Sequence, residues 1–149
     1  MLTVVEKVIL LQNVDVFEGI PTEQLSYLAA IAEEVPFSKD EGIYQFGEVS
    51  DALYIVLEGE VRLHRDDENI IHARSNDPFG AWALFDDKPR VATATGVTGG
   101  RLLRIYREDF LDLLSDHSQI TEGVLKMIVG RLRGLLERVE ANLGQKRGN

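Results

Sequence analysis

The sequence predicts a mostly β domain, a jelly-roll-like β-roll (double-stranded β-helix) flanked by α-helices. Between residues 34 and 106, short runs of alternating apolar and polar residues are separated by glycines, as in sheets built from many short strands. On both sides of this region, apolar residues recur at helical spacing. A chain of 149 residues suffices for one domain with its own core and is too short for two ordinary ones, so we expect a single domain over residues 1–149.

Helices are predicted within residues 3–33. The first dozen residues carry apolar side chains at helical spacing, namely Val4, Val5, Val8, Ile9 and Leu11. Thr22, directly after a proline, resembles a helix start, and the segment after it carries a second apolar face of Leu25, Leu28, Ala29, Ile31 and Ala32. We expect this second helix to end near Val35–Pro36, because proline cannot continue a helix.

The region over residues 34–106 is predicted to form the β-roll. Its clearest strands are Leu53–Glu58, Val61–Arg65, Ile70–Arg74, Arg90–Val97 and Leu102–Tyr106, where aliphatic and β-branched residues alternate with polar ones. The acidic segment 66–69 predicts a polar hairpin tip. The regular spacing of short strands favours a sandwich or roll over an alternating β/α sheet.

Two C-terminal helices are predicted over residues 107–143, a short one from Arg107 to about Ser115 and a long one from about Ser118 to Leu143. The long helix carries apolar residues at alternating spacings of three and four, namely Leu125, Ile128, Leu132, Leu135 and Val139. This stripe fits either a seam between two copies of the helix or a face packed on the chain's own β domain. About two heptads keep the pattern, fewer than the roughly three to four typical of a coiled coil.

Composition excludes several classes of function. A formal net charge of -9 argues against a nucleic-acid-binding surface, and the absence of cysteine excludes disulfides and thiolate zinc sites. Neither a membrane-spanning run nor a secretion signal is apparent, so we predict a cytoplasmic protein. His64 and His72 flank the hairpin tip without a third metal ligand, and no catalytic motif is recognisable, so neither a metal site nor an enzyme is expected.

The segment over residues 78–95 carries the most functional information. Gly80 opens a predicted short helix near residues 80–85, and Arg90 follows it after a loop. Glycine lets a ligand approach the backbone, the start of a helix offers unpaired N–H donors, and a guanidinium adds a planar fork for anionic oxygens. The segment therefore predicts a phosphate site, although Arg90 could instead form a surface ion pair with Asp86 or Asp87.

Three stretches together resemble the cyclic-nucleotide-binding domain family, which includes the bacterial catabolite activator, regulatory subunits of cyclic-AMP-dependent kinase and gated channels. These stretches are Phe46-Gly47-Glu48 with Asp51 to Val61, the segment 78–95, and Leu102 to Ile105 followed by Arg107-Glu108-Asp109-Phe110. The second resembles the family's phosphate-binding cassette, which commonly reads Phe-Gly-Glu, a few small or apolar residues, a loop, and Pro-Arg. The resemblance covers roughly residues 13–140.

The resemblance implies a β-roll of about eight strands with a cyclic nucleotide, cyclic AMP or cyclic GMP, lying inside it. Gly80 matches the cassette glycine, the amides from Ala81 to Leu84 match the donors to the cyclic phosphate, and Arg90 matches the phosphate arginine. The implied ligand-binding residues are Gly80, Ala81, Trp82, Ala83, Leu84, Arg90, Val91 and Ala92. The resemblance implies no other cofactor.

Ala81 departs from the family pattern, which places at this position a glutamate that accepts a hydrogen bond from the ribose 2′-hydroxyl. A methyl group cannot accept one, and a lost hydrogen bond to a charged partner costs roughly 1.5 to 3 kcal/mol, about ten- to a hundredfold in affinity. The expected ligand is therefore a cyclic nucleotide bound weakly or another small phosphate-bearing anion. Trp82 either fills part of the pocket or packs outward on a neighbour.

Three function hypotheses follow from the sequence. The leading one is a non-enzymatic regulatory or sensor domain that belongs to a larger protein with an effector domain and can dimerise through its last helix. The alternative is a ligand-free β-roll that serves as a protein-interaction or dimerisation module. The third, an enzyme with a cupin-like metal site, lacks the required ligands. No DNA-binding domain is expected, because residues 144–149 read as a short polar tail.

Overall fold

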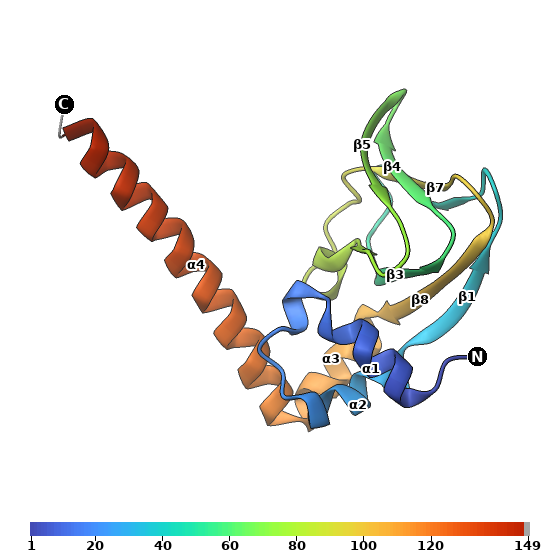
Figure 1. Ribbon diagram of the computed structural model, residues 1–149, viewed down its shortest axis with the longest axis horizontal. Coiled ribbons are helices and arrows are strands. Elements are labelled where there is room, and N and C mark those ends of the chain that lie inside the picture. Colours follow the sequence, from blue (N-terminus) through green and yellow to red (C-terminus); the bar gives the residue numbers. More distant parts are fainter. Residues whose placement is uncertain (148–149) are drawn as a thin grey trace.

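The computed structural model describes residues 1–147, which fold as a β-roll flanked by helices (Figure 1).

The N-terminal segment forms short helical elements, as expected. Helix α1 (Val4–Gln12) begins with a capping box, in which Thr3 Oγ1 accepts from the Glu6 amide and the Glu6 carboxylate accepts from the Thr3 amide, both at 3.2 Å. The 3₁₀ turns η1 (Asp15–Phe17) and η2 (Thr22–Gln24) lead into α2 (Leu25–Ile31).

The second helix is shorter than the sequence suggested. Helix α2 ends at Ile31, and strand β1 (Glu33–Phe37) already contains Val35 and Pro36, where we had placed the end of the helix. Strand β1 lies at the edge of its sheet. A proline is tolerated there because an edge strand leaves part of its N–H groups unpaired.

Two antiparallel four-stranded sheets form the roll, with strand orders β1-β8-β3-β6 and β2-β7-β4-β5. The remaining strands are β2 (Gly42–Tyr44), β3 (Ala52–Glu58), β4 (Val61–Arg65), β5 (Glu68–Ala73), β6 (Pro78–Phe79), β7 (Thr93–Gly96) and β8 (Gly100–Tyr106). The predicted jelly-roll-like architecture is thus confirmed. The strand order follows from pairing segments far apart in sequence, such as β3 with β8.

One predicted strand needs correction. The strand predicted to start at Arg90 starts only at Thr93, because the preceding residues pair with the loop before β3: the Arg90 amide donates to Glu48 O at 2.7 Å. At the hairpin tip, His64 lies opposite Asn69 and His72 opposite Arg62, so the two histidines do not face each other across the strands. Among the described residues, no group of three or more His, Asp or Glu side chains could hold a metal ion.

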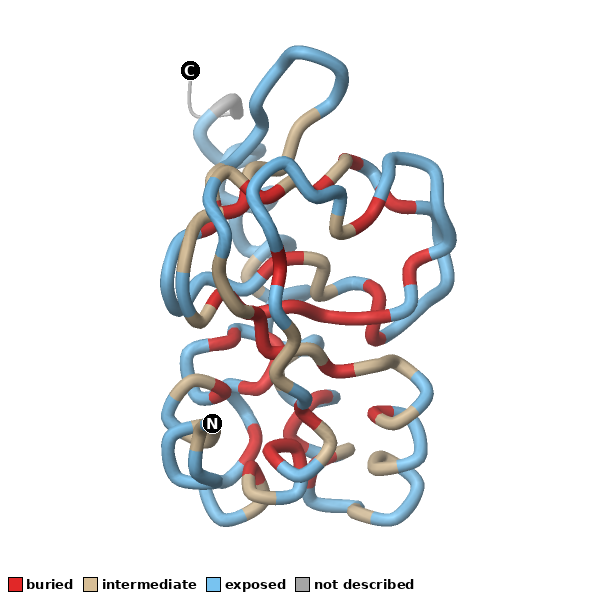
Figure 2. Tube along the Cα trace, turned by 90° about the vertical axis from the view of Figure 1, so that its right-hand side faces the viewer, coloured by how far each residue is buried: buried red, intermediate tan, exposed pale blue. Residues whose placement is uncertain are grey.

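The central strand β3 is buried on both faces rather than alternating. Leu53 and Ile55 pack with the helices in one core, whereas Tyr54 and Val56 point into the interior of the roll and join a second core. Figure 2 shows the buried positions in both halves of the molecule. The sheet that contains β3 and β8 therefore separates the two cores, and the cassette lies at their boundary.

The last two helices differ in how they pack. Helix α3 (Arg107–Asp116) buries Phe110, and α4 (Ser118–Arg147) buries only its first turns, through Ile120 and Val124. Gly123 of α4 packs directly against Gly19, where a side chain on either glycine would meet the other backbone. Further along, Met127 packs against the helical core and Arg131 Nη2 pairs with Asp15 Oδ2 at 3.1 Å. After these contacts α4 projects away from the body (Figure 1).

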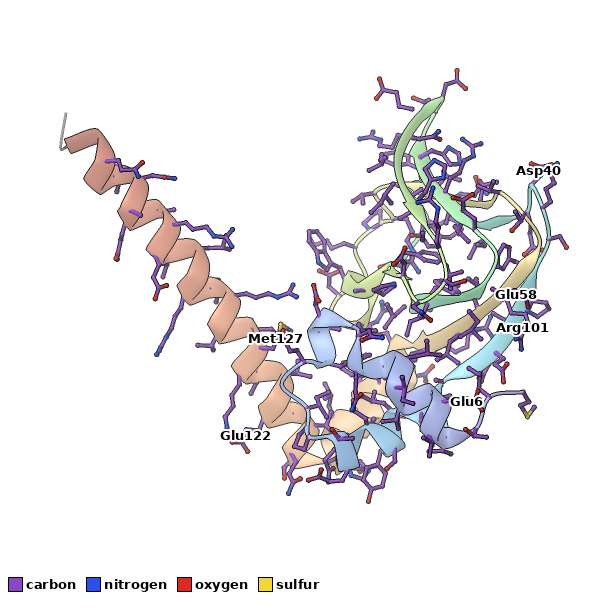
Figure 3. All side chains as sticks on the ribbon, viewed as in Figure 1. Glu6, Asp40, Glu58, Arg101, Glu122 and Met127 are labelled. Carbon is purple, nitrogen blue, oxygen red and sulfur yellow. The ribbon has the colours of Figure 1, made fainter. Side chains whose placement is uncertain are left out.

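The stripe of five apolar residues predicted on α4 is 37 to 57% exposed, so the explanation that it packs on the chain's own β domain is wrong. Figure 3 shows the side chains of the projecting part of α4 reaching into open space. The helix continues through Arg147, into the segment expected as a polar tail, and residues 148 and 149 of that tail lie outside the described part of the chain. No helix among the described residues is long and apolar enough to cross a membrane.

Candidate functional site

The cassette begins with a glycine that no other residue could replace without strain. Gly80 has a φ of 74°, in the left-handed region, and it precedes the 3₁₀ turn η3 (Ala81–Leu84). A Cβ atom at this position would lie 2.6 Å from Arg90 Nη1. Glycine is therefore needed twice, once for the backbone conformation and once to leave room for the guanidinium.

Arg90 is buried, with a side chain only 5% exposed. Its Nη2 donates to Ala52 O at 2.8 Å, and its Nη1 donates to Gly80 O at 3.5 Å. The nearest carboxylate oxygen, from Asp51, lies 3.9 Å away. The alternative of a surface ion pair with Asp86 or Asp87 is therefore wrong, because the guanidinium turns inward and joins the cassette to strand β3.

Aromatic rings cover the inner side of this guanidinium. The Tyr44 ring centroid lies 3.9 Å from Arg90 Cζ, and that of Tyr54 lies at 5.9 Å. Tyr44, Tyr54 and Phe79 pack together with centroids 5.3 to 6.1 Å apart. Such cation–π contacts stabilise a cation that has left water.

Burial raises the pKa of the Tyr44 and Tyr54 hydroxyls above their ordinary value of 10.0, and the charge of Arg90 opposes this shift only in part. Both hydroxyls are therefore protonated at neutral pH. They can donate hydrogen bonds inside the roll, beside a fixed positive charge.

The amides of the cassette turn are only partly available to an anion. The Ala83 amide donates to Gly80 O at 3.2 Å, which makes it the first bonded position of η3. The amides of Ala81 and Trp82 precede this bond, as the first N–H groups of any helical turn do. Because η3 has four residues, its dipole is small, and any anion here depends mainly on these amides and on Arg90.

The predicted site residues do not all face the same way. Ala83, Leu84 and Ala92 are buried, and Ala81 packs against the helical core with a methyl group that offers no acceptor. Trp82 is 76% exposed and Val91 70% exposed, so both side chains lie at the surface. The structure therefore brings Gly80 and Arg90 together at the roll and leaves Trp82 outside it.

Two further groups belong to this site and were not singled out from the sequence. Tyr44 and Tyr54 stand at inward positions of their strands, a role that the alternation of strand residues could have indicated. The other is Arg107, the first residue of α3, whose Nη1 donates to the carbonyl oxygens of Ser50, Ala83 and Asp86. Arg107 thus ties the C-terminal helices to the cassette turn, a contact that nothing in its local sequence signals.

The antiparallel β-roll, the buried arginine and the glycine-led turn are the features that the resemblance to the cyclic-nucleotide-binding fold implies. Residues 34–117, more than half of the chain, match the sequence model of the cyclic nucleotide-binding domain. The chain belongs to this family.

Known relatives agree with this assignment. The chain is 28% identical over 129 residues to the CRP-like cAMP-activated global transcriptional regulator of Mycobacterium tuberculosis, an alignment covering 83% of this chain and 58% of that protein. It is 32% identical over 113 residues to the cAMP-dependent protein kinase regulatory subunit of Dictyostelium discoideum, covering 70% of this chain and 33% of that protein. The chain thus spans little more than half of the first of these relatives.

Among solved structures, the N-terminal domain of a transcriptional regulator from Streptomyces coelicolor A3(2) superimposes with a TM-score of 0.80 at 27% identity. The match covers 87% of this chain and 94% of that chain. The sensor domain of the transcriptional regulator DNR from Pseudomonas aeruginosa gives a TM-score of 0.66 at 25% identity and covers 86% of this chain.

Proposed function

We propose that this chain is a non-enzymatic regulatory domain whose β-roll binds a small phosphate-bearing anion, such as a cyclic nucleotide, at Arg90 and the first amides of the cassette turn. The observation that carries the proposal is the burial of Arg90 against Gly80, at the one place where the turn leaves room for it. A buried cation is costly unless it is paired, and an anionic ligand would complete its pairing.

Binding of a cyclic nucleotide would be weaker than in relatives with a glutamate at the position of Ala81. The ribose hydroxyl finds no acceptor there, and two donors of Arg90 already bond Ala52 O and Gly80 O. An anion must share or displace these bonds. This agrees with a ligand affinity about ten- to a hundredfold below that of a complete site.

A signal would leave the site through Arg107. Its guanidinium donates hydrogen bonds to Ala83 O and Asp86 O of the cassette turn. Arg107 is also the first residue of α3, the helix that leads into α4. A ligand that shifts the turn would change these bonds and bias the direction of α4. Helix α4 would pass the change to a second copy or to an effector domain in a longer parent protein.

The apolar stripe of α4 supports pairing with a second copy of the chain. Its five residues are exposed together on the projecting helix, and contiguous exposed apolar surface of this kind marks an interaction site. Their spacing fits a two-helix seam. We therefore include a homodimer through α4 in the proposal.

Thermal unfolding with cyclic AMP, cyclic GMP and inorganic phosphate tests the ligand proposal. Ligand at about a hundred times its dissociation constant adds roughly 2.7 kcal/mol to the free energy of unfolding. We expect millimolar cyclic nucleotide to raise the melting temperature. No shift with any of these anions would contradict the proposal.

The variant Ala81→Glu isolates the ribose contact. It should strengthen cyclic AMP binding by about ten- to a hundredfold, measured by calorimetry, because it restores an acceptor for the 2′-hydroxyl. Inorganic phosphate has no ribose and serves as the matched control, so its affinity should not increase. Equal or weaker binding of cyclic AMP by the variant would place the ligand elsewhere.

A ligand-free interaction module is the second candidate. It is favoured by the internal hydrogen bonds of Arg90. Through these bonds the guanidinium links the residue before η3 to strand β3 without any ligand. Under this alternative, no anion shifts the melting temperature, whereas dimerisation through α4 persists.

A further inference from the structure

Trp82 is an exposed aromatic residue on a rigid turn. Its neighbours in η3, Ala83 and Leu84, are buried and fix the turn, while the indole itself is 76% exposed. Phe85 beside it is 38% exposed, and the next two residues, Asp86 and Asp87, are exposed carboxylates. Tryptophan is among the residues that most often anchor protein interfaces. The cassette turn thus presents an aromatic anchor with an acidic border.

Helix α4 exposes apolar side chains beside the seam stripe as well as within it. Besides the seam stripe defined above, it carries a second stripe of Val129, Leu136 and Leu143, spaced seven residues apart and 49 to 61% exposed. A two-helix seam uses two positions of every seven-residue repeat. The second stripe occupies one further position of the same repeat. The seam itself keeps only about two heptads. In a dimer paired through α4, part of the second stripe would remain open to a further contact.

The charges on α4 complement the border of the cassette turn. The helix holds six of the chain's 16 basic residues and three of its 25 acidic ones. Arg133 lines a shallow groove of about 370 Å³ together with Val129 of the second stripe and Leu125 of the seam. Lys126 and Glu122 also line it and form an ion pair with each other at 2.9 Å. An aromatic side chain next to carboxylates can pack on the apolar lining of this groove and place a carboxylate near Arg133.

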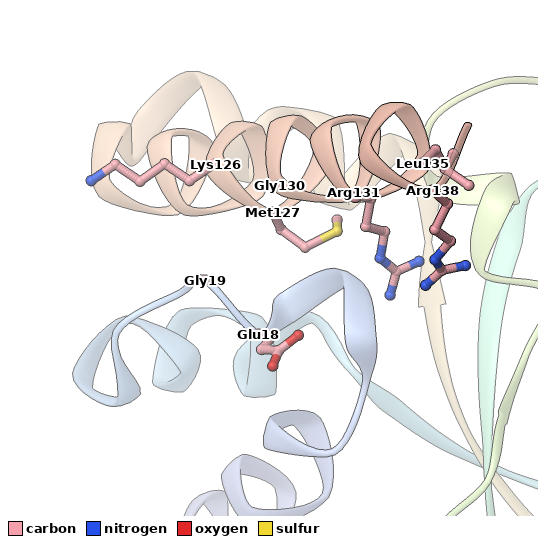
Figure 4. Close-up of a pocket in the computed structure, with 9 residues that line it drawn as sticks. Glu18, Gly19, Lys126, Met127, Gly130, Arg131, Leu135 and Arg138 are labelled. Atoms are coloured by element: carbon pink, nitrogen blue, oxygen red, sulfur yellow. The ribbon is translucent and has the colours of Figure 1, made fainter. Parts of the chain in front are cut away.

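The chain's own α4 cannot supply this contact. Its body-facing side carries Met127, Arg131 and Arg138, which line an open groove of about 660 Å³ opposite the loop of Glu18 and Gly19 (Figure 4). At 3.6 residues per turn, Val129 and Leu136 lie roughly half a turn away from this side. The second stripe therefore faces away from the chain's own cassette.

We propose that, in the dimer paired through α4, Trp82 of each copy docks on the second stripe of the partner's α4, with Asp86 and Asp87 facing Arg133. This inference rests on the α4 pairing included in the proposed function. A twofold axis makes the contact occur twice, because each copy presents both the anchor and the stripe. In Figure 1 the cassette turn lies on the side of the roll that faces α4.

The docking would couple the ligand site to assembly. Trp82 belongs to the same four-residue turn whose first amides and Gly80 frame the Arg90 site. A ligand that moves this turn moves the anchor, and the dimer affinity then depends on the ligand. By linkage, dimerisation changes ligand affinity by the same factor.

Trp82 is the only tryptophan of the chain, so fluorescence excited selectively at tryptophan reports on the surroundings of this side chain and not on the four tyrosines. On serial dilution of the full chain, we expect the emission maximum to move to longer wavelength in step with the loss of the dimer mass in light scattering. The seam variant Leu132→Asp should be monomeric and show the long-wavelength emission at every concentration. Its acrylamide quenching should also equal that of the diluted wild type.

Variants separate the anchor from the seam. Trp82→Ala should weaken dimerisation by at least about tenfold, as loss of an interface anchor does. Val91→Ala, which shortens an equally exposed apolar residue of the cassette segment, is the matched control and should leave it unchanged. Leu136→Asp should weaken the dimer and expose Trp82 in the dimer that remains, whereas Ala141→Asp adds the same charge outside both stripes and should do neither.

Two results would overturn the docking while sparing the pairing of α4. One is a wild-type dimer whose Trp82 emission and quenching equal those of the Leu132→Asp monomer. The other is a dissociation constant that Trp82→Ala leaves unchanged. A chain that stays monomeric at all concentrations would overturn both pairing and docking, and the thermal shift with anions would still decide the ligand proposal on its own.

Discussion

The β-roll and α4 place their apolar side chains in opposite ways. In the roll, strand β3 buries leucine, isoleucine and valine on both faces, and even the cation Arg90 is enclosed by carbonyl oxygens and tyrosine rings. In α4, eight leucine, isoleucine and valine residues between Leu125 and Leu143 stand at least a third exposed. The roll buries its apolar side chains within one chain, whereas the helix leaves most of its apolar side chains exposed.

The largest difference in unfolding free energy is expected when a leucine is replaced by alanine once in the roll and once in α4. Leu53→Ala in β3 deletes a fully buried side chain between the roll and the helices and should lower the free energy of unfolding by about 2 to 5 kcal/mol. Leu132→Ala in α4 should change it by less than about 0.5 kcal/mol, because that side chain is exposed in the single chain. Urea unfolding at a concentration where the protein is monomeric measures both, and equal effects would contradict the difference described.

Replacing glycine by alanine should lower the stability in the cassette turn and raise it in α4. Gly80→Ala should cost about 1 to 3 kcal/mol for the left-handed backbone alone, and its Cβ would also displace the Arg90 guanidinium. Gly130→Ala in α4 meets no atom within 4 Å and should stabilise the monomer by up to about 1 kcal/mol through helix propensity. The two melting temperatures should move in opposite directions, and a stabilising Gly80→Ala would mean that the cassette turn is not held as described.

The smallest effect concerns the tyrosines beside Arg90. Because burial raises the pKa of Tyr44, the folded state binds that proton more tightly than the unfolded state. The resulting stability is fully present below the ordinary pKa of 10.0 and is lost as the pH rises through the higher folded value.

Tyr44→Phe should therefore reduce the fall in unfolding free energy above pH 10 and leave its value at pH 7 within about 1 kcal/mol. Denaturant unfolding at pH 7 and above pH 10 measures this, with Tyr27→Phe as the control at a tyrosine that is 44% exposed. An unchanged alkaline slope in Tyr44→Phe would contradict the burial of its hydroxyl.

Much of the fold was predictable because its signals are local. Alternating strands and glycine breaks indicated the roll, and helical spacing placed α1, α2, α3 and α4 within a few residues. The predicted element boundaries were wrong where pairing with a distant segment overrides the local preference for helix or strand. Pro36 entered a strand because β8 pairs with β1, and the residues after Pro89 left the predicted strand to pair with the loop before β3.

For the candidate site, the sequence indicated Gly80 and Arg90 and the missing acceptor at Ala81. It did not indicate what Arg90 contacts. Ala52 and Tyr44 lie 38 and 46 positions earlier in the chain, and only the closed roll brings them to the guanidinium. Likewise, the hydrogen bond from Arg107 to Ala83 O in the cassette turn depends on where the fold places helix α3 relative to that turn.

The sequence by itself determined the family, the roll and the presence of an apolar stripe on the last helix, because periodicity and motif spacing depend on neighbours along the chain. It left open whether this stripe forms a seam between two copies or packs on the chain's own β domain. Only the tertiary structure decided that Arg90 points inward, that Trp82 points outward and that α4 leaves its apolar stripes uncovered. These outcomes depend on which groups meet through space. Carbonyl oxygens and aromatic rings compensate the burial of a cation. Packing of the N-terminal half of α4, together with the ion pair between Arg131 and Asp15, sets the direction of that helix.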